Sequence, residues 1–397
     1  MALRTHHPAV TFAKGLTMKS SICEMLGIDF PLLAFSHCRD VVAAVSRAGG
    51  MGVFGAVNLP PDRLREELTW IDAHCGGKPY GVDLIVPNSM EGKSEAFSRD
   101  ALLAAVPQGH KDFASGILTS HGIEPGNLDE DRERSVGFAR NMRAEGAANS
   151  LEVAFQFPIR LIANALGVPP PVMLEMGKRH GVPVAALVGA KEHAVAQVQA
   201  GVDILVVAGG EAGGHCGEVS TMVLVPEVHR AVQAMGATTP ILAAGGITTG
   251  TQMAAAMSMG AAGAWCGSVW LTTTEAETSE TIKQKMLAAS SRDTVRSRSR
   301  TGKHSRQLRS PWTDAWERAD APVPLGMPLQ SFVSEPALRR VNKLAETGHE
   351  GAKQLATYWV GQGVGLMNQS MSCVQVVQQF REEFLEARER LIALLED

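Results

Sequence analysis

Four glycines precede a histidine near the middle of the chain, directly after a short apolar run. The run Ile204–Val207 is typical of a buried strand, and Val206–Glu218 continues it as VVAGGEAGGHCGE. Glycines at the end of a strand let backbone N–H groups approach a ligand closely, because no Cβ intervenes and positive φ costs little. His215 ends this run, and an imidazole with an ordinary pKa near 6.5 can exchange a proton with a bound substrate. The segment therefore indicates an enzyme that binds a phosphate-bearing cofactor.

Two further glycine turns support a phosphate site. Gly245 and Gly246 follow the apolar run PILAA, and Gly267 and Ser268 follow AGAWC about twenty residues later. In a (β/α)₈ barrel, phosphates commonly bind to the loops after strands 7 and 8. Backbone amides from both turns and one hydroxyl could then converge on a single phosphate.

Short apolar runs alternate with amphipathic helical patterns over most of the chain, which predicts βα units and a parallel sheet. Eight such runs and the helical lengths between them predict a (β/α)₈ TIM barrel of the α/β class, with a helical insertion and a helical C-terminal extension. The predicted strands are Leu32–Phe35, Gly52–Gly55, Gly81–Ile85, Leu151–Phe155, Val184–Leu187, Ile204–Val207, Ile241–Ala244 and Gly263–Trp265. The predicted helices include Val41–Ala48, Pro61–His74, Pro171–His180, Lys191–Ala200, Val225–Met235 and Thr251–Met259.

The barrel pattern is interrupted once and then gives way to a different composition. We expect an N-terminal extension over 1–17, barrel strands 1 and 2 with their helices over 18–87, and a helical insertion over 88–150. Residues 151–290 would hold strands 4 to 8 and the cofactor site, and 291–397 a basic loop and helices. The basic, Ser/Arg-rich loop is expected to be a solvated connection, the alternative being a cover for the site. The charged final helix should pack on the barrel or on a second subunit.

Composition excludes several classes of protein. The formal net charge of −4 argues against a nucleic-acid or anionic-membrane binder, and no apolar stretch approaches the ~20 residues of a membrane span. The six cysteines are scattered without a CxxC pair, so neither a disulfide framework nor a metal site is expected. No secretory signal is recognisable in the first residues. We therefore expect a cytoplasmic enzyme with a small-molecule substrate.

Three motifs resemble one known family. The segments EAGGHCGEVSTMVLVPEV, PILAAGGITTGTQMAAAMSMGAAGAWCGSVWLTT and YWVGQGVGLM look like the FMN-dependent nitronate monooxygenase (2-nitropropane dioxygenase) family. Its relatives include flavin-type enoyl-acyl-carrier-protein reductases and NADH:quinone reductases. The resemblance covers Ser21–Val86 and Leu151–Met367 and is densest over Val184–Thr273.

The resemblance implies a set of site residues. His215 takes the position implicated in proton transfer, and His193 aligns with a histidine that the quinone-reductase relatives place near the flavin. His37, at the end of strand 1, is a further candidate, whereas Cys216 and Cys266 are not expected to be catalytic. The implied FMN contacts are Asp83, Ala208, Gly213, Gly214, Gly245, Gly246, Trp265, Cys266, Gly267 and Ser268.

Several positions depart from the family pattern. Ala34–His37 replaces the usual Gln-Ala-Pro-Met of strand 1, and Ala208 and Trp265 each replace a glutamine. Gln156 stands in the expected strand-4 signature, and Asp83 replaces an asparagine, which an ionised carboxylate cannot match as a hydrogen-bond donor. Fewer polar and more apolar contacts to the flavin ring follow from these changes.

Three functions remain open at this point. The first is an FMN-dependent monooxygenase that oxidises alkyl nitronates or a similar small carbon acid with O₂. The second is a reductase in which NAD(P)H reduces the flavin and an enoyl thioester, enone or quinone accepts the electrons. The third is a non-redox phosphate-binding barrel or a catalytically inactive binding module. The helical tail also suggests a homodimer.

Overall fold

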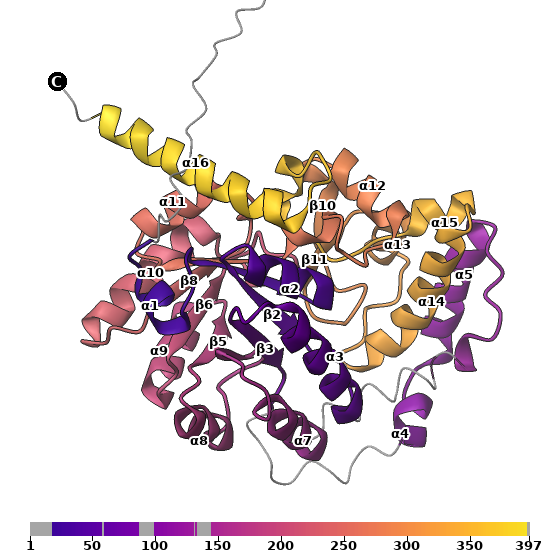
Figure 1. Cartoon of the computed structure of the whole chain (residues 1–397). Coiled ribbons are helices and arrows are strands. Elements are labelled where there is room, and N and C mark those ends of the chain that lie inside the picture. Colours follow the sequence, from indigo (N-terminus) through magenta and orange to yellow (C-terminus); the bar gives the residue numbers. More distant parts are fainter. Residues whose placement is uncertain (1–17, 58, 87–98, 131, 133–143, 395–397) are drawn as a thin grey trace, which may run out of the picture.

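A closed barrel of eight parallel strands forms the centre of the molecule (Figure 1). The computed structural model describes residues 18–57, 59–86, 99–130, 132 and 144–394. The strands follow one another around the barrel in chain order, which confirms the predicted (β/α)₈ architecture. They are β1 Leu32–Ser36, β2 Met51–Gly55, β3 Tyr80–Leu84, β4 Leu161–Asn164, β5 Val184–Val188, β6 Ile204–Ala208, β8 Ile241–Ala244 and β9 Gly263–Cys266.

One predicted strand was wrong. Residues Leu151–Phe155 lie at the end of helix α7 (Ala144–Ala154) and in the turn after it, and β4 follows at Leu161–Asn164. The run LEVAF is apolar enough for a strand, but Leu151, Val153 and Ala154 pack instead as the buried face of a helix against α3 (Pro61–His74). Gln156 therefore belongs to the turn after α7 and not to the fourth strand.

Helices surround the barrel, and proline and glycine set several of their ends. Pro61 and Pro171 occupy the first turns of α3 and α8, while Gly181 and Gly201 end α8 and α9 in the left-handed conformation. These bounds match the predicted helices closely. The outer helices are α1 Ser21–Leu26, α2 Arg39–Arg47, α3 Pro61–His74, α8 Pro171–His180, α9 Lys191–Ala200, α10 Thr221–Ala234 and α11 Gly250–Ser258.

Alternate strand residues point into the barrel and fill it with apolar side chains. The interior cluster contains Leu33, Met51, Val53, Leu161, Ala163, Ala185, Ile204, Val206, Leu242, Ala244 and Trp265. Phe35, Leu187 and Ala208 are only partly buried on this cluster, because each lies near the carboxyl end of its strand. These three side chains and Trp265 thus belong to the end of the barrel where active sites of this fold lie.

The basic segment after residue 290 is not the solvated connection that we expected. It forms a hairpin of β10 (Thr294–Ser297) and β11 (Ser305–Leu308), and β11 pairs with β7 (Gly214–His215) in a small antiparallel sheet. Ser297, Ser299 and Gln307 are fully buried or nearly so. The many small hydroxyl side chains of the segment explain this burial, because they are compact and find hydrogen-bond partners within the hairpin.

Further helices extend the barrel on one side. Helix α14 packs against α15 and α5, whereas the long α16 lies across α11 and α2, as the predicted packing of the final helix requires (Figure 1). Within the predicted insertion over 88–150, α4 and α5 are described, and residues 88–98, 131 and 133–143 lie outside the described residues. The remaining helices are α4 Arg99–Ala104, α5 Gln108–Ser120, α12 Glu280–Ala288, α13 Pro311–Trp316, α14 Leu329–Glu346, α15 Glu350–Leu355 and α16 Cys373–Ala393.

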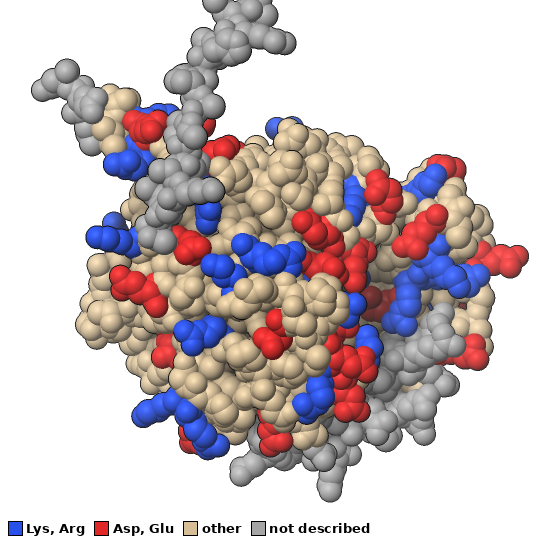
Figure 2. Space-filling view, in the orientation of Figure 1, with Lys and Arg blue, Asp and Glu red and all other residues tan. Residues whose placement is uncertain are grey.

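The surface shows no dominant charge on the visible face. Lysine and arginine side chains alternate there with aspartate and glutamate over the outer helices (Figure 2). Within the described ranges, no helix has the length and apolar character needed to cross a bilayer.

Candidate functional site

The glycine loop after β6 is held rigidly from three directions. The Glu211 carboxylate accepts the backbone N–H of Thr221 at 2.8 Å, and the Glu211 carbonyl accepts the N–H of Gln362 at 2.9 Å. From the hairpin, the Arg306 guanidinium donates to the Gly210 carbonyl at 2.9 Å. These hydrogen bonds fix Gly210 and Glu211, so the loop presents its backbone groups in one arrangement, as a preorganised binding site requires.

His215 lies in β7, where the glycine loop meets the hairpin. Its Nε2 is 2.8 Å from the hydroxyl of Thr301, its backbone pairs with Ser305, and its ring lies 6.4 Å from that of Trp359. The residue is solvent-exposed by area, yet enough protein surrounds the ring to lower its pKa by desolvation, and the charge of Lys303 lowers the pKa further. His215 is therefore a neutral imidazole near pH 7, the form that accepts a proton.

The glycine turns after β8 and β9 leave four backbone amides unpaired. The N–H groups of Gly245, Gly246, Gly267 and Ser268 donate to no other group of the described chain. Gly245 and Gly246 have φ of +93° and +74°, a conformation that favours glycine. The Gln252 side chain donates to the Gly246 carbonyl at 2.8 Å and so holds that turn in place. Unpaired backbone amides of this kind are the groups that bind anions in other proteins.

The motif YWVGQGVGLM packs directly on both glycine loops. The Gly361 N–H donates to the Ser268 hydroxyl oxygen at 2.8 Å, and that oxygen's own proton stays available for a ligand. A Cβ at Gly213 would lie 2.7 Å from the Gly361 nitrogen. Gly213 is thus required for the approach of this segment, whereas a Cβ at Gly214 would meet open space.

Asp83 lies at the carboxyl end of β3 and is 1% exposed. Its Oδ1 has no hydrogen-bond partner within the described residues, and burial raises the pKa of the carboxyl well above its ordinary value. This burial therefore favours the protonated carboxyl over the ionised one. A protonated carboxyl offers one O–H donor and one carbonyl acceptor, the same pair that an asparagine amide offers.

Two aromatic rings from β1 and β9 stack at the mouth of the barrel. Phe35 and Trp265 stack with their centroids 6.1 Å apart, and the His37 ring packs edge-on against Phe35 at 5.2 Å. His37 bonds through Nδ1 to the Gly55 carbonyl at 2.6 Å, and burial lowers the pKa of its imidazole. Together with Ala208 at the end of β6, these residues give the mouth the apolar, aromatic wall predicted from the sequence.

The remaining candidates, His193, Cys266 and Cys216, make none of the contacts described above. His193 is exposed in the first turn of α9, and no hydrogen bond or ring contact joins it to His215 among the described residues. The Cys266 thiol is 2% exposed, packs toward the helices and has a raised pKa, so it is neither accessible nor ionised. Burial also raises the pKa of Cys216, which fits its assignment as non-catalytic.

Three residues beside His215 were not predicted from the sequence. Thr301 and Ser305 come from the hairpin, and Trp359 comes from the segment after α15. Trp359 donates through its indole N–H to the Ser305 hydroxyl at 3.3 Å and carries the Arg300 guanidinium on its ring at 3.9 Å. The sequence offered one signal for these residues, the Thr-Gly-Lys turn within the basic segment, which marks the tip of a hairpin. The composition of the whole segment is otherwise typical of a loop.

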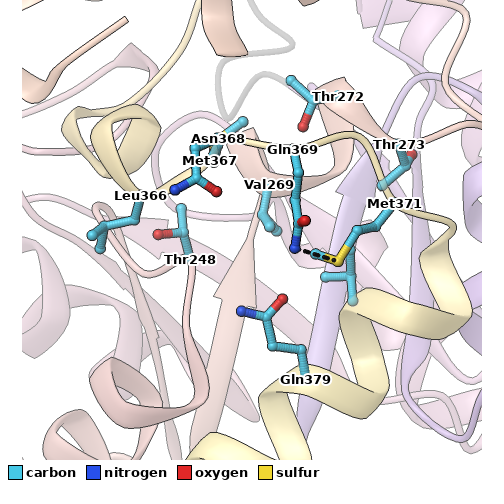
Figure 3. Close-up of a pocket in the computed structure, with 11 residues that line it drawn as sticks. Thr248, Val269, Thr272, Thr273, Leu366, Met367, Asn368, Gln369, Met371 and Gln379 are labelled. Carbon is cyan, nitrogen blue, oxygen red and sulfur yellow. Dashed lines mark hydrogen bonds between the residues drawn. The ribbon is translucent and has the colours of Figure 1, made fainter. Parts of the chain in front are cut away.

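A small cavity lies between the segments that follow β8 and β9 and helix α16. It measures about 30 Å³, enough for a water molecule or two, and is bounded by the loop after β8, the segment after β9 and α16 (Figure 3). Thr248, Gln369 and Gln379 turn polar groups toward it. Its size excludes an organic substrate.

Comparison with known proteins identifies the family. The model of the nitronate monooxygenase family matches residues 21–383. Rv1533 of Mycobacterium tuberculosis, named as a candidate monooxygenase, is 52% identical over 96% of this chain and 100% of its own length. A "Probable nitronate monooxygenase" of Staphylococcus saprophyticus is 26% identical over 91% of this chain and 97% of its own.

A solved structure shows the same fold. The nitroalkane oxidase of Streptomyces ansochromogenes superposes with a TM-score of 0.75 at 23% identity, covering 94% of this chain and 100% of the oxidase. The family match spans the barrel, the glycine turns after β8 and β9 and the first half of α16. The chain therefore belongs to the nitronate monooxygenase family and is an oxidoreductase.

Proposed function

We propose that the protein is an FMN-dependent monooxygenase that oxidises alkyl nitronates or a similar small carbon acid with O₂. The observation that carries the proposal is the imidazole of His215, which Thr301 contacts at the end of the glycine loop. That loop also approaches the turn after β8, where a Cβ on Gly246 would lie 3.0 Å from Glu211 Cβ. The family and the name of the Staphylococcus relative support this chemistry.

The residues at the barrel mouth fit a flavin mononucleotide. Four unpaired amides and the Ser268 hydroxyl match a terminal phosphate, which accepts several hydrogen bonds. The orphaned Oδ1 of buried Asp83 matches the polar edge of a flavin ring, and the Phe35–Trp265 pair matches its apolar part. Gly246 has room for a phosphate because it carries no side chain, and a Cβ there would lie 3.0 Å from Glu211 Cβ.

Each group of the site then has a distinct task. When bound, FMN supplies the electron-accepting ring that protein side chains lack. Gly245, Gly246, Gly267 and Ser268 would anchor its phosphate, and Asp83 would orient its ring. His215 would accept the α-proton of a small carbon acid, which its lowered pKa suits because the ring enters the reaction neutral.

The competing reductase function differs in its source of electrons. Anaerobic mixing of the purified protein with an alkyl nitronate, followed by absorbance of the flavin, should show bleaching, and O₂ should then be consumed on aeration. Bleaching by NADH or NADPH together with no response to several nitronates would establish the reductase and contradict our proposal. A colourless protein from which no flavin can be extracted would instead favour the non-redox barrel.

A further inference from the structure

The turn between β10 and β11 contacts His215 with a single side chain. Thr301 is 6% exposed, and its hydroxyl oxygen lies 2.8 Å from His215 Nε2, although 86 residues separate the two in the chain. The strand register makes this contact necessary, because Ser305 pairs with His215 and the turn residues lie directly beyond that pair.

The turn is rigid enough to define where the hydroxyl lies. Gly302 has φ of +82°, and a Cβ there would lie 1.9 Å from the Leu325 carbonyl oxygen, so only glycine fits. The Gly302 N–H donates to the Arg298 carbonyl at 3.0 Å, and the Arg298 guanidinium donates back to the Gly302 carbonyl at 2.8 Å. Thr301 is therefore held through its neighbour Gly302, by one backbone hydrogen bond and one from the Arg298 side chain.

The single proton of the Thr301 hydroxyl has two candidate acceptors, the Lys303 carbonyl and His215 Nε2, and its direction sets the tautomer of the imidazole. Thr301 Oγ1 donates to the Lys303 carbonyl at 3.3 Å, which uses its one proton, and it accepts the Lys303 N–H at 3.4 Å. With its proton directed to the Lys303 carbonyl, the hydroxyl would serve His215 as an acceptor, and Nε2 would then carry the hydrogen. We propose that Thr301 is a positioning residue that holds His215 as the Nε2–H tautomer and leaves Nδ1 as the proton-accepting atom.

This arrangement suits both stages of a proton transfer. The Nε2–H donates to Thr301 in the neutral ring and more strongly in the imidazolium, because a hydrogen bond from a charged donor is stronger. Lys303 acts in the opposite direction, since its charge lowers the pKa of His215, and no carboxylate contributes to that shift among the described groups. The role of Nδ1 as the proton acceptor rests on the proposed function, whereas the assignment of the tautomer does not.

The test uses holoprotein labelled with ¹⁵N in its histidines. Ring nitrogen shifts report the tautomer and the pKa of His215 directly, and His215→Asn identifies its signals. We expect Nε2–H in the wild type and in Thr301→Ser, and a mixture of tautomers with a lower pKa in Thr301→Val, which loses the acceptor. An Nδ1–H tautomer in the wild type, or unchanged signals in Thr301→Val, would overturn the proposal whatever the enzyme's activity.

Kinetics add a second readout. Thr301→Val should lower kcat/KM for a neutral nitroalkane, whose α-proton His215 would accept, by roughly 10- to 100-fold, the scale of a misplaced catalytic group, and should have no further effect in a His215→Asn background. A full additional loss in that background would show a role unrelated to His215. Thr313→Val is the matched control, because it removes another fully buried threonine hydroxyl, in α13 away from the site. If Thr301→Val does not fold, the wild-type and Thr301→Ser spectra still decide whether His215 is the Nε2–H tautomer.

Discussion

The proposed chemistry depends on His215 and on its neutral imidazole. His215→Asn keeps a hydrogen-bonding side chain of similar reach but cannot accept a proton. We expect it to retain its flavin and to lower turnover by roughly 10²- to 10⁴-fold, the usual contribution of a general base. Flavin absorbance and steady-state oxygen consumption measure the two effects. Unchanged turnover would move the proton-transfer role to His37 or His193.

Asp83 shows how burial changes the chemistry of a residue. Its pKa in the folded protein is raised above the value of 3.8 in the unfolded chain, so between these two values the folded state binds more protons. The free energy of unfolding therefore falls as pH rises through this window. Asp83→Asn removes the titration, and we expect this variant to exceed the wild type in stability at pH 8 by at least about 1 kcal/mol.

The measurement for Asp83→Asn is urea unfolding of the flavin-loaded protein at pH 5 and pH 8. The stability advantage of the variant should grow from pH 5 to pH 8. Only the wild type must keep a buried carboxyl protonated, and the free-energy cost of doing so rises with pH. An advantage that is equal at both pH values would show that Asp83 does not titrate in this range.

At the scale of single residues, the local sequence pattern was enough to predict the positions of some site residues only. His215 and the glycines follow strands within the same βα unit, so their position at the barrel mouth could be predicted. Thr301 and Trp359 reach His215 through pairing across 86 and 144 residues, and no local periodicity contains that information. The protonation of Asp83 also depends on burial by other strands and could not be inferred from its type.

The turn after β8 is the element on which the proposed phosphate contact most directly depends. Gly246→Val would place a branched side chain where the backbone and a phosphate meet, and its Cβ would already crowd Glu211 at 3.0 Å. We expect this variant to fold and to be purified without flavin, as measured by the ratio of flavin to protein absorbance.

A matched control separates steric exclusion from backbone strain. Gly181→Val changes a glycine with a similar φ of +64° at the end of α8, where a Cβ would meet nothing within 4 Å. Both substitutions strain the backbone, but only Gly246→Val should lose the cofactor. Normal flavin occupancy in Gly246→Val, or equal loss in both variants, would contradict the placement of the phosphate.

Elements were predicted best where one local signal dominated. The bounds of α3, α8 and α9 follow from proline at the start or glycine at the end, and most barrel strands from short apolar runs. The run Leu151–Phe155 carried no such punctuation, and its apolar side chains suit a helix face as well as a strand. The hairpin was missed because its strands are polar and short and gain their stability from pairing with β7.

At the scale of the whole molecule, α16 ties the last part of the chain to the first. Its buried face packs on α11 and α2, and Glu383 accepts the Gly250 N–H at the start of α11 at 2.8 Å. Its far end leaves Leu391, Ile392 and Leu394 exposed. The homodimer suggested by the helical tail stays a prediction, which sedimentation of the full chain tests.

Because α16 completes the core around the barrel, loss of its central contact should destabilise the entire fold. Phe380 is 1% exposed within the cluster between the barrel and its helices, and the backbone of Gly250 approaches it closely. Phe380→Ala should lower the free energy of unfolding by about 3–5 kcal/mol, measured by urea titration. Leu391→Ala, on the same helix but 52% exposed, should change it by less than about 0.5 kcal/mol. Equal effects of the two would mean that α16 packs on the barrel less tightly than these contacts require.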